Sequence, residues 1–172
     1  MALAIRPLRA HDLPHLKDLH RILLPVRYPP QFFLQLLIVP ERSCLVAIDA
    51  GNLVGFVSAT LHIPAPADDQ LGTVRATPPR IELLTLGVAA PYQNAGLATL
   101  LVKAIHESLR KRLDKIRPDC TSLVTCAHVA TTNAPAIAFY ERLGLYVIPD
   151  IIRGFYRTAS GPRDAHLVMG VL

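Results

Sequence analysis

Cysteine is scarce in this sequence, and its placement excludes two common uses of the residue. The 172 residues include three cysteines, Cys44, Cys120 and Cys126, and no two of them form a CxxC pair. This pattern fits neither a disulfide framework nor a cysteine-ligated zinc site. His11 and His15 lie four residues apart, but no third ligand accompanies them. We therefore expect reduced thiols, a cytoplasmic location and no bound metal.

Long apolar runs are also missing. Hydrophobic residues make up 51% of the chain, yet no stretch reaches the roughly 18 apolar residues that a membrane-spanning helix needs. The first twelve residues carry Arg6 and Arg9 and lack the apolar core of a signal peptide. We expect neither a signal peptide nor any association with a membrane.

Charge is present in a modest amount and with a mild excess of one sign. Charged residues make up 18% of the chain and the net charge is +5, which excludes an extended disordered protein. Five cations cluster near the C-terminal end of one predicted helix, where the helix dipole favours positive charge. We therefore interpret them as a solvent-exposed face and not as an RNA contact. The five cations are Arg110, Lys111, Arg112, Lys115 and Arg117. We do not expect direct binding of nucleic acid.

Hydrophobic periodicity predicts an α/β fold with a sheet of mixed direction, in one domain that spans residues 1–172. Turn signals at 49–52 predict a hairpin, and the polar, proline-rich segment 64–79 predicts a mobile loop. The predicted strands are 4–8, 44–48, 53–63, 80–88, 121–129, 145–148 and 165–171. The predicted helices are 13–23, with Leu13, Leu16, Leu19, Ile22 and Leu23 near one face, then 32–39, 97–113 and 133–144.

A short turn with one glycine connects the strand that ends at Val88 to the helix that begins near Leu97. Backbone N–H groups at a helix N-terminus attract anions, and Gly96 allows a ligand to approach closely. The segment has neither the lysine of a Walker A loop nor the glycines of GxGxxG. From the residues alone it is either a phosphate loop or a simple connection.

Two motifs in this order resemble those of the GNAT family of N-acetyltransferases. Gln93-x-x-Gly96-x-Ala98 is similar to the Q/R-x-x-G-x-G/A pyrophosphate loop. About forty residues later, Asn133-Ala134-Pro135-Ala136-Ile137-Ala138-Phe139-Tyr140 followed by Leu143-Gly144-Leu145 resembles the N-x-x-A-x-x-F-Y…G-F segment. The resemblance implies the GNAT fold, with a mostly antiparallel twisted sheet of about seven strands and about four helices. It also implies acetyl-CoA as cosubstrate.

The resemblance assigns cofactor contacts to both motifs and to the strand before the turn. A bulge in that strand is expected to part it from its parallel neighbour, so that the pantetheine arm can pair with freed backbone groups. Tyr140 stands where the family places a general acid for the departing thiolate; its plain alternative is a core aromatic. The implied cofactor-binding residues are Leu86, Val88, Gln93, Asn94, Ala95, Gly96, Leu97, Ala98, Thr99, Asn133 and Tyr140.

Shorter segments resemble the catalytic subunits of NatE-type N-terminal acetyltransferases. They are LPVRY at 24–28, LTLGVAAPY at 84–92, and FYR with DAH at 155–157 and 164–166. This resemblance implies protein N-termini as substrates, mainly initiator methionine followed by a hydrophobic residue, and NatA subunits and the ribosome as partners. The implied substrate-binding residues are Leu24, Pro25, Val26, Tyr28, Phe155 and Tyr156.

The position of the base departs from the family pattern. His128 matches a family histidine that holds the water which removes the amine proton, but Glu82 stands where the family has a tyrosine. Glu82 is either the base, alone or through water with His128, or a strand-end residue paired with Arg80 or another cation. We favour the first interpretation, which makes Glu82, His128 and Tyr140 the candidate catalytic residues. A buried structural histidine is the alternative for His128.

Two other functions fit the same sequence. A GNAT enzyme could acetylate lysine or another amine, although the segments at 24–28 and 155–157 favour an N-terminal amine. The missing tyrosine at Glu82 also fits a catalytically weak subunit that binds acetyl-CoA within a ribosomal complex.

Overall fold

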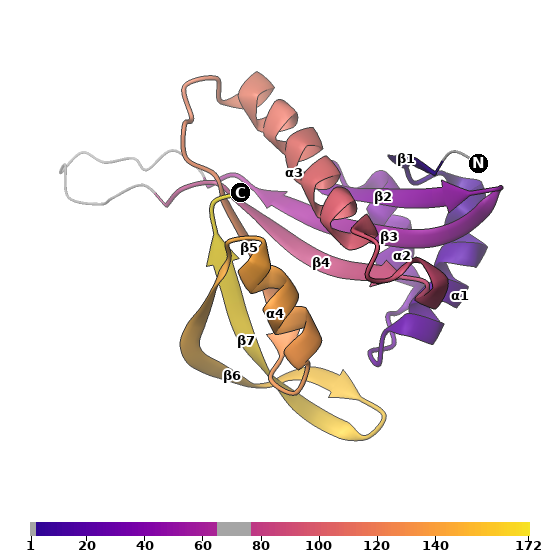
Figure 1. Ribbon diagram of the computed structural model, residues 1–172. Coiled ribbons are helices and arrows are strands. Elements are labelled where there is room, and N and C mark those ends of the chain that lie inside the picture. The colour runs from indigo at the N-terminus through magenta and orange to yellow at the C-terminus, as the bar shows by residue number, and fades with distance from the viewer. Residues whose placement is uncertain (1–2, 65–76) are drawn as a thin grey trace.

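The computed structural model describes residues 3–64 and 77–172, and its helices and strands follow the predicted order (Figure 1). The strands are β1 (Ala4–Pro7), β2 (Arg42–Asp49), β3 (Asn52–His62), β4 (Arg80–Val88), β5 (Val124–Ala130), β6 (Tyr146–Thr158) and β7 (Gly161–Gly170). The helices are α1 (Leu13–Leu23), α2 (Pro30–Ile38), α3 (Leu97–Ile116) and α4 (Ala134–Arg142), with the 3-10 turns η1 (Ala10–Asp12) and η2 (Ala90–Tyr92). Most of the predicted loop 64–79 lies outside the described residues.

One sheet of seven strands holds the molecule together, in the order β1-β2-β3-β4-β5-β7-β6. Only the central pair β4–β5 is parallel, and the other neighbours are antiparallel. The predicted hairpin is confirmed: Asp49 pairs with Asn52, and Ala50 and Gly51 between them have φ values of 48° and 83°. A two-residue turn with two positive φ values matches the twist of the flanking strands. The sheet is therefore mixed and mostly antiparallel, as predicted.

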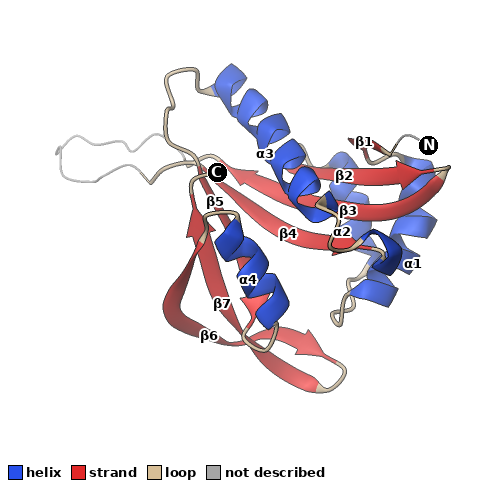
Figure 2. Ribbon diagram, viewed as in Figure 1, coloured by secondary structure: helices blue, strands red, loops and turns tan. Residues whose placement is uncertain are grey.

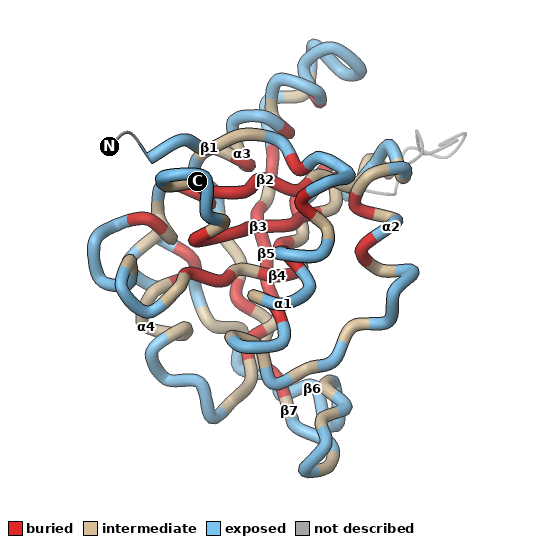
Figure 3. The backbone as a smooth tube through the Cα atoms, turned by 90° about the vertical axis from the view of Figure 1, so that its right-hand side faces the viewer, coloured by how far each residue is buried: buried red, intermediate tan, exposed pale blue. Residues whose placement is uncertain are grey.

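The helices cover the two faces of the sheet in pairs (Figures 1 and 2). Helices α1 and α2 lie on one face, and α3 and α4 lie on the other. Burial is concentrated along the central strands between these layers (Figure 3). The core under α3 is large and mainly aliphatic, whereas the core under α1 and α2 is smaller and includes Phe33 and Phe56. In the described parts of the chain, no helix is long and apolar enough to cross a bilayer.

Helix α1 corrects the predicted apolar face of its segment. Ile22 is 75% exposed, whereas His20 is 3% exposed and faces the core. His20 follows Leu16 by four residues, so the two share one helix face. The buried face of α1 therefore includes His20, which the prediction missed because it considered only apolar residues.

The C-terminal hairpin is longer than predicted. The strand predicted at 145–148 extends through β6 to Thr158, and its pairing with β7 is interrupted twice, between Val147 and Ile151 and between Ile152 and Tyr156. Pro149 lies in the first interruption and Gly154, with a φ of 62°, in the second. An edge strand tolerates both residues at such irregularities, although in a sequence they indicate a break. This extension brings Tyr156 to the candidate site.

Candidate active site

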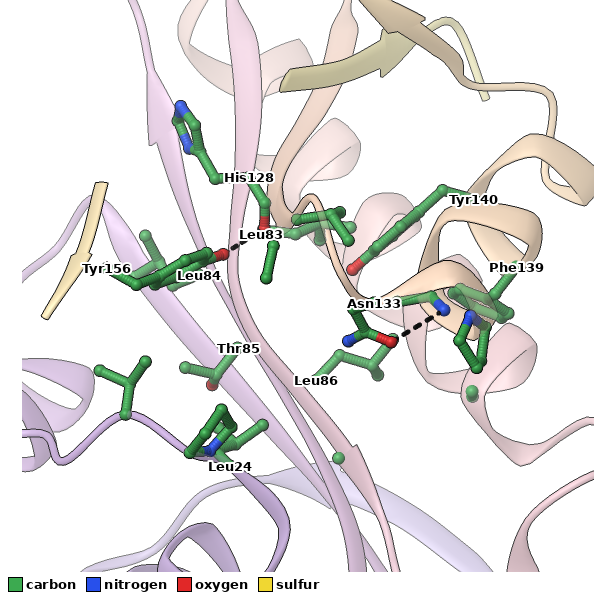
Figure 4. Close-up of a pocket in the computed structure, with 18 of the residues that line it drawn as sticks. Leu24, Leu83, Leu84, Thr85, Leu86, His128, Asn133, Phe139, Tyr140 and Tyr156 are labelled. Atoms are coloured by element: carbon green, nitrogen blue, oxygen red, sulfur yellow. Dashed lines mark hydrogen bonds between the residues drawn. The ribbon is translucent and has the colours of Figure 1, made fainter. Parts of the chain in front are cut away.

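A bulge in β4 opens the centre of the sheet. Ser58 pairs with Thr85 and Ala59 with Leu83, so Leu84 is an extra residue in β4. The parallel pairing of β4 with β5 runs from Arg80 to Leu83 and stops at that point. Beyond it a cavity of about 540 Å³ lies between residues of β4, β5 and α4 (Figure 4). The bulge and the parted strands are those that the GNAT resemblance implies.

The turn between β4 and α3 forms one end of this opening. Gly96 has a φ of 83° and directly precedes α3, and Gln93 donates a hydrogen bond of 2.8 Å from Nε2 to the carbonyl oxygen of Val88. The first intrahelical hydrogen bond joins the N–H of Leu100 to the oxygen of Gly96. The N–H groups before Leu100 are therefore free of helical partners, because every α-helix begins with such unpaired donors. They create a positive end on a helix of 20 residues.

A second hollow of about 740 Å³ lies over this helix end. It shares Val88, Gln93, Ala98, Pro135 and Phe139 with the first cavity, so the two hollows adjoin. Four more of the predicted cofactor-binding residues line the second hollow, namely Asn94, Gly96, Leu97 and Thr99. Ala95, which was also predicted, lines neither hollow.

Two cations that the sequence analysis missed, Lys103 and Arg142, also line the second hollow. Lys103 lies on α3 and Arg142 on α4. Together with the helix end, they make this hollow suitable for a ligand with several negative charges.

Helix α4 forms one wall of the first cavity. Asn133 is its N-cap, and its Oδ1 accepts a hydrogen bond of 3.2 Å from the N–H of Ala136. Tyr140 points from α4 into the cavity, and burial raises the pKa of its hydroxyl (Figure 4). Because it stays protonated, this hydroxyl can donate a proton or a hydrogen bond inside the cavity.

The opposite wall comes from the connection between α1 and α2. Leu24, Pro25 and Val26 supply apolar surface, and Tyr28 lies beside them with the pKa of its hydroxyl raised by burial. All four of these predicted substrate-binding residues line the cavity. They suit an apolar side chain with a polar group close by.

The two aromatic residues of β6 have different surroundings. Tyr156 lines the cavity and donates a hydrogen bond of 2.6 Å to the carbonyl oxygen of His128 (Figure 4). Phe155 does not line the cavity; its ring stacks on the ring of His128 with centroids 4.1 Å apart. Of this predicted pair, Tyr156 can reach a substrate directly, whereas Phe155 contacts the histidine.

The two candidate bases lie on neighbouring strands, and they differ in their access to the cavity. His128 is a lining residue, and Glu82 is not. The Oε1 atom of Glu82 lies 3.4 Å from Nδ1 of His128, and its Oε2 atom lies 2.9 Å from Nε2 of His62. Glu82 thus bridges two histidines, and His62 was not a predicted site residue. The predicted alternative, an ion pair between Glu82 and Arg80, is not among these contacts, because both nitrogens belong to histidines.

A buried chain of polar side chains lies under the bulge. The hydroxyls of Ser58 and Thr85 are 2.5 Å apart, and Nε2 of His20 lies 3.4 Å from Oγ1 of Thr85. The ring of His20 stacks on Phe56 with centroids 4.1 Å apart, and burial lowers its pKa to about 4. Thr85 lines the cavity, so this chain of side chains connects the cavity to the core under α1.

In residues 3–64 and 77–172, no group of three or more acidic, histidine or cysteine side chains is arranged to hold a metal ion.

Two known proteins are similar in sequence to most of this chain. A protein of Saccharolobus solfataricus named N-alpha-acetyltransferase is 26% identical over 164 residues, which cover 95% of this chain and 90% of that protein. An Arabidopsis thaliana protein named histone acetyltransferase MCC1 is 27% identical over 177 residues, which cover 94% of this chain and 67% of that protein.

A solved structure has the same fold. Arabidopsis thaliana Naa50 in complex with the bisubstrate analogue CoA-Ac-MVNAL superposes with a TM-score of 0.75 over 100% of both chains, at 24% identity. Residues 13–145 of this chain also match the model of the acetyltransferase (GNAT) family. That match spans well over half of the chain, and it includes the bulged strand, the glycine turn and α4. The chain therefore belongs to the GNAT family of acetyltransferases.

Proposed function

We propose that this protein transfers the acetyl group of acetyl-CoA to the α-amino group at the N-terminus of proteins. The observation that carries the proposal is the cavity between the parted strands β4 and β5. It adjoins an anion-binding hollow on one side and an apolar wall with a tyrosine on the other. The relatives named for N-terminal acetylation and for a CoA–peptide analogue support the same reaction.

The cofactor end suits the phosphates and arm of acetyl-CoA. The pyrophosphate would lie against the N–H groups from Asn94 to Thr99, with Lys103 and Arg142 nearby as counter-charges. The pantetheine arm would pair with the backbone of β4 around Leu86 and Val88, where β5 has parted from it. A backbone N–H near Val88 would polarise the thioester carbonyl.

An α-amine is easier to use than a lysine in this cavity. An α-amino group has a reference pKa of about 7.7–8.0 and a lysine about 10.4, so neutralising the α-amine costs about 3.5 kcal/mol less. A modest base is then sufficient. His128, which lines the cavity beside Glu82, would accept the proton, and Tyr140 would protonate the leaving thiolate.

The peptide would enter along the wall of the α1–α2 connection. Leu24, Pro25 and Val26 would contact the first side chain, which fits methionine, and Tyr28 and Tyr156 would hydrogen-bond the peptide backbone. The peptide portion MVNAL of the analogue bound by Naa50 begins with methionine and a hydrophobic residue. We propose the same preference here.

A lysine acceptor is the second candidate, because one relative is named a histone acetyltransferase. The test compares a peptide that begins Met-Leu with the same peptide blocked at its N-terminus and carrying one internal lysine. We expect acetylation of the free N-terminus, measured by mass spectrometry. Preferred labelling of the blocked peptide would favour the lysine acceptor instead.

The third candidate is a weak subunit that binds acetyl-CoA within a larger complex, which the loss of the family tyrosine at Glu82 favours. Turnover equal to a no-enzyme control, together with acetyl-CoA binding measured by calorimetry, would support it.

We extend the main proposal to a cytoplasmic enzyme that associates with NatA subunits at the ribosome. Co-sedimentation with ribosomes in the presence and absence of NatA subunits tests this extension.

A further inference from the structure

Glu82 on β4 contacts two histidines, His62 on β3 and His128 on β5. In the sheet, Glu82 on β4 is opposite Thr60 on β3 and opposite Cys126 on β5. His62 and His128 each lie two residues beyond those partners, so all three side chains share one face. The exposed fractions are 37% for His62, 24% for Glu82 and 20% for His128. The cluster thus leads from the cavity toward solvent.

The contacts favour one form of the His128 ring. A carboxylate attracts a hydrogen on the ring nitrogen that faces it. Nδ1 of His128 lies 3.4 Å from Oε1 of Glu82, which favours the neutral ring with its hydrogen on Nδ1 and its lone pair on Nε2. The stacked ring of Phe155 restricts rotation of the imidazole. Nε2 is therefore the nitrogen available to take a proton.

We propose that His62 is a positioning residue, which holds Glu82 so that the carboxylate orients His128 as the proton acceptor. The inference rests on the proposed function for its kinetic consequence. His128 lines the cavity, and neither Glu82 nor His62 does, so both act through His128. The contact of 2.9 Å with His62 is the shorter of the two and occupies the second oxygen of Glu82.

The proton balance of the reaction gives each residue one role. The amine nitrogen bonds to the thioester carbon, the carbon–sulfur bond breaks, and its electron pair leaves with the sulfur of CoA. The ammonium loses one proton before the attack, to Nε2 of His128 directly or through one water, and the nitrogen loses a second by the same route as the carbon–sulfur bond breaks. His128 passes each proton to bulk water. Glu82 faces the resulting imidazolium, and His62 keeps the carboxylate in place. Tyr140 protonates the thiolate and regains its proton from water.

Two substitutions of His62 separate positioning from mere packing. His62→Leu removes the donor to Glu82, and we expect kcat to fall about 5- to 10-fold, with both KM values within about twofold of wild type. His62→Gln retains an amide N–H donor and should restore kcat to within about twofold of wild type. His15→Leu and His15→Gln, on the exposed face of α1 and outside both hollows, are the matched controls.

A double-mutant cycle tests the link through Glu82. Glu82→Gln should lower kcat about 10- to 100-fold, and adding His62→Leu to it should cause no further loss, because His62 then has no carboxylate to hold. A double variant that falls by the product of the two single effects would overturn the proposal. So would equal losses in His62→Leu and His62→Gln.

A measurement without substrate separates this inference from the proposed function. Ring nitrogen NMR of the free protein should place the hydrogen of neutral His128 on Nδ1, and His62→Leu should give a mixture of both tautomers. A wild-type ring with its hydrogen on Nε2 contradicts the inference, whatever amine the enzyme uses. Failure of the Met-Leu assay with the expected NMR result would instead contradict the proposed function alone.

Discussion

The two faces of the sheet use different chemistry to serve one cavity. On the α3 face the core is mainly aliphatic, with Leu101, Ile105 and Leu109 completely buried, and the second hollow lies over the unpaired backbone N–H groups at the start of α3. On the α1 face, the core is smaller, and its polar residues His20, Ser58 and Thr85 are at most 5% exposed. Under the proposed function, the cofactor side thus depends on backbone geometry, and the amine side on side chains that can titrate or hydrogen-bond.

This difference explains where the chain departs from its family pattern. A backbone N–H is supplied by almost any residue, so the glycine turn needs only its left-handed Gly96 and a helix after it. The amine side needs particular side chains in particular places. The departure that the resemblance indicates, Glu82 for tyrosine, lies on this side, and His62 contacts the Glu82 carboxylate at 2.9 Å. We expect three changes to affect the two sides unequally: a lower pH, the substitution of Gly96 and the loss of the ring contact between Phe155 and His128.

Acid should produce the largest effect, and on the α1 side. The pKa of His20 is about 4 in the folded protein against a reference of 6.5, so the unfolded chain binds a proton that the folded one does not between these values. Stability should therefore fall as pH drops through this window, by up to about 3 kcal/mol. Urea unfolding from pH 7 to 4.5 measures the change, and His20→Gln should remove most of it.

A histidine on the other face supplies the control. Burial and Arg110 also lower the pKa of His106 on α3, but this ring is only half-buried, so His106→Gln should remove a smaller part of the slope. The Arg6 guanidinium holds the pKa of Asp12 at about 2, so its stabilising effect is lost only below this window. Equal slopes in the two histidine variants would contradict the contrast between the faces.

Substitution of the left-handed glycine Gly96 should have the next largest effect, on the proposed cofactor side. Gly96 has a φ of 83° and open space where a Cβ would lie, so Gly96→Ala costs about 1–2 kcal/mol through backbone strain alone. If the turn relaxes, its N–H groups move, and we expect the KM for acetyl-CoA to rise about tenfold, a cost of about 1.4 kcal/mol in binding. Steady-state kinetics at saturating peptide measures this change.

Gly51 is a matched control for that substitution. It has the same φ of 83° and the same open surroundings, but it lies in the β2–β3 hairpin and lines neither hollow. Gly51→Ala should therefore lower stability by a similar amount and leave the KM for acetyl-CoA unchanged. A rise in KM of similar size in both variants would mean that general destabilisation, and not the turn, weakens cofactor binding.

Loss of a ring contact should have the smallest effect. Phe155 stacks on His128 at 4.1 Å, and aromatic pairs contribute about 0.5–1.5 kcal/mol. Phe155→Leu should lower kcat/KM for the peptide about threefold, a value within that range, whereas Phe155→Tyr keeps the ring and should retain wild-type activity. If Phe155→Tyr loses as much as Phe155→Leu, then the stack does not orient His128.

The parts of the molecule that the sequence predicted best are local ones. The order of helices and strands and the hairpin at Asp49–Asn52 depend on neighbouring residues, and the structure has them as predicted. The long β6 was missed because Pro149 and Gly154 indicate a break, and only its position at the sheet edge makes them tolerable. The exposure of Ile22 was missed because adjacent residues of a helix point about 100° apart, so Ile22 is turned away from the face that Leu16 and His20 share.

Parts of the site depend on contacts between residues far apart in the sequence. His62 reaches Glu82 only through the β3–β4 register, and Arg142 joins Lys103 only because α4 packs near the start of α3. No spacing in the sequence indicates either pair. His20 is different, because it lies four residues after Leu16 on a helix and could have been recognised as a core residue.

The point where β4 and β5 part also affects how this protein meets other chains. A strand with free backbone groups at the rim of a sheet attracts further strands and promotes aggregation. Here the free groups of β4 beyond Leu83 lie in the middle of a seven-stranded sheet, between β3 and the wall formed by β5 and α4. A slender extended ligand can reach them, but a second sheet cannot. The molecule can thus keep a strand edge ready for pairing without the risk of self-association that an outer edge carries.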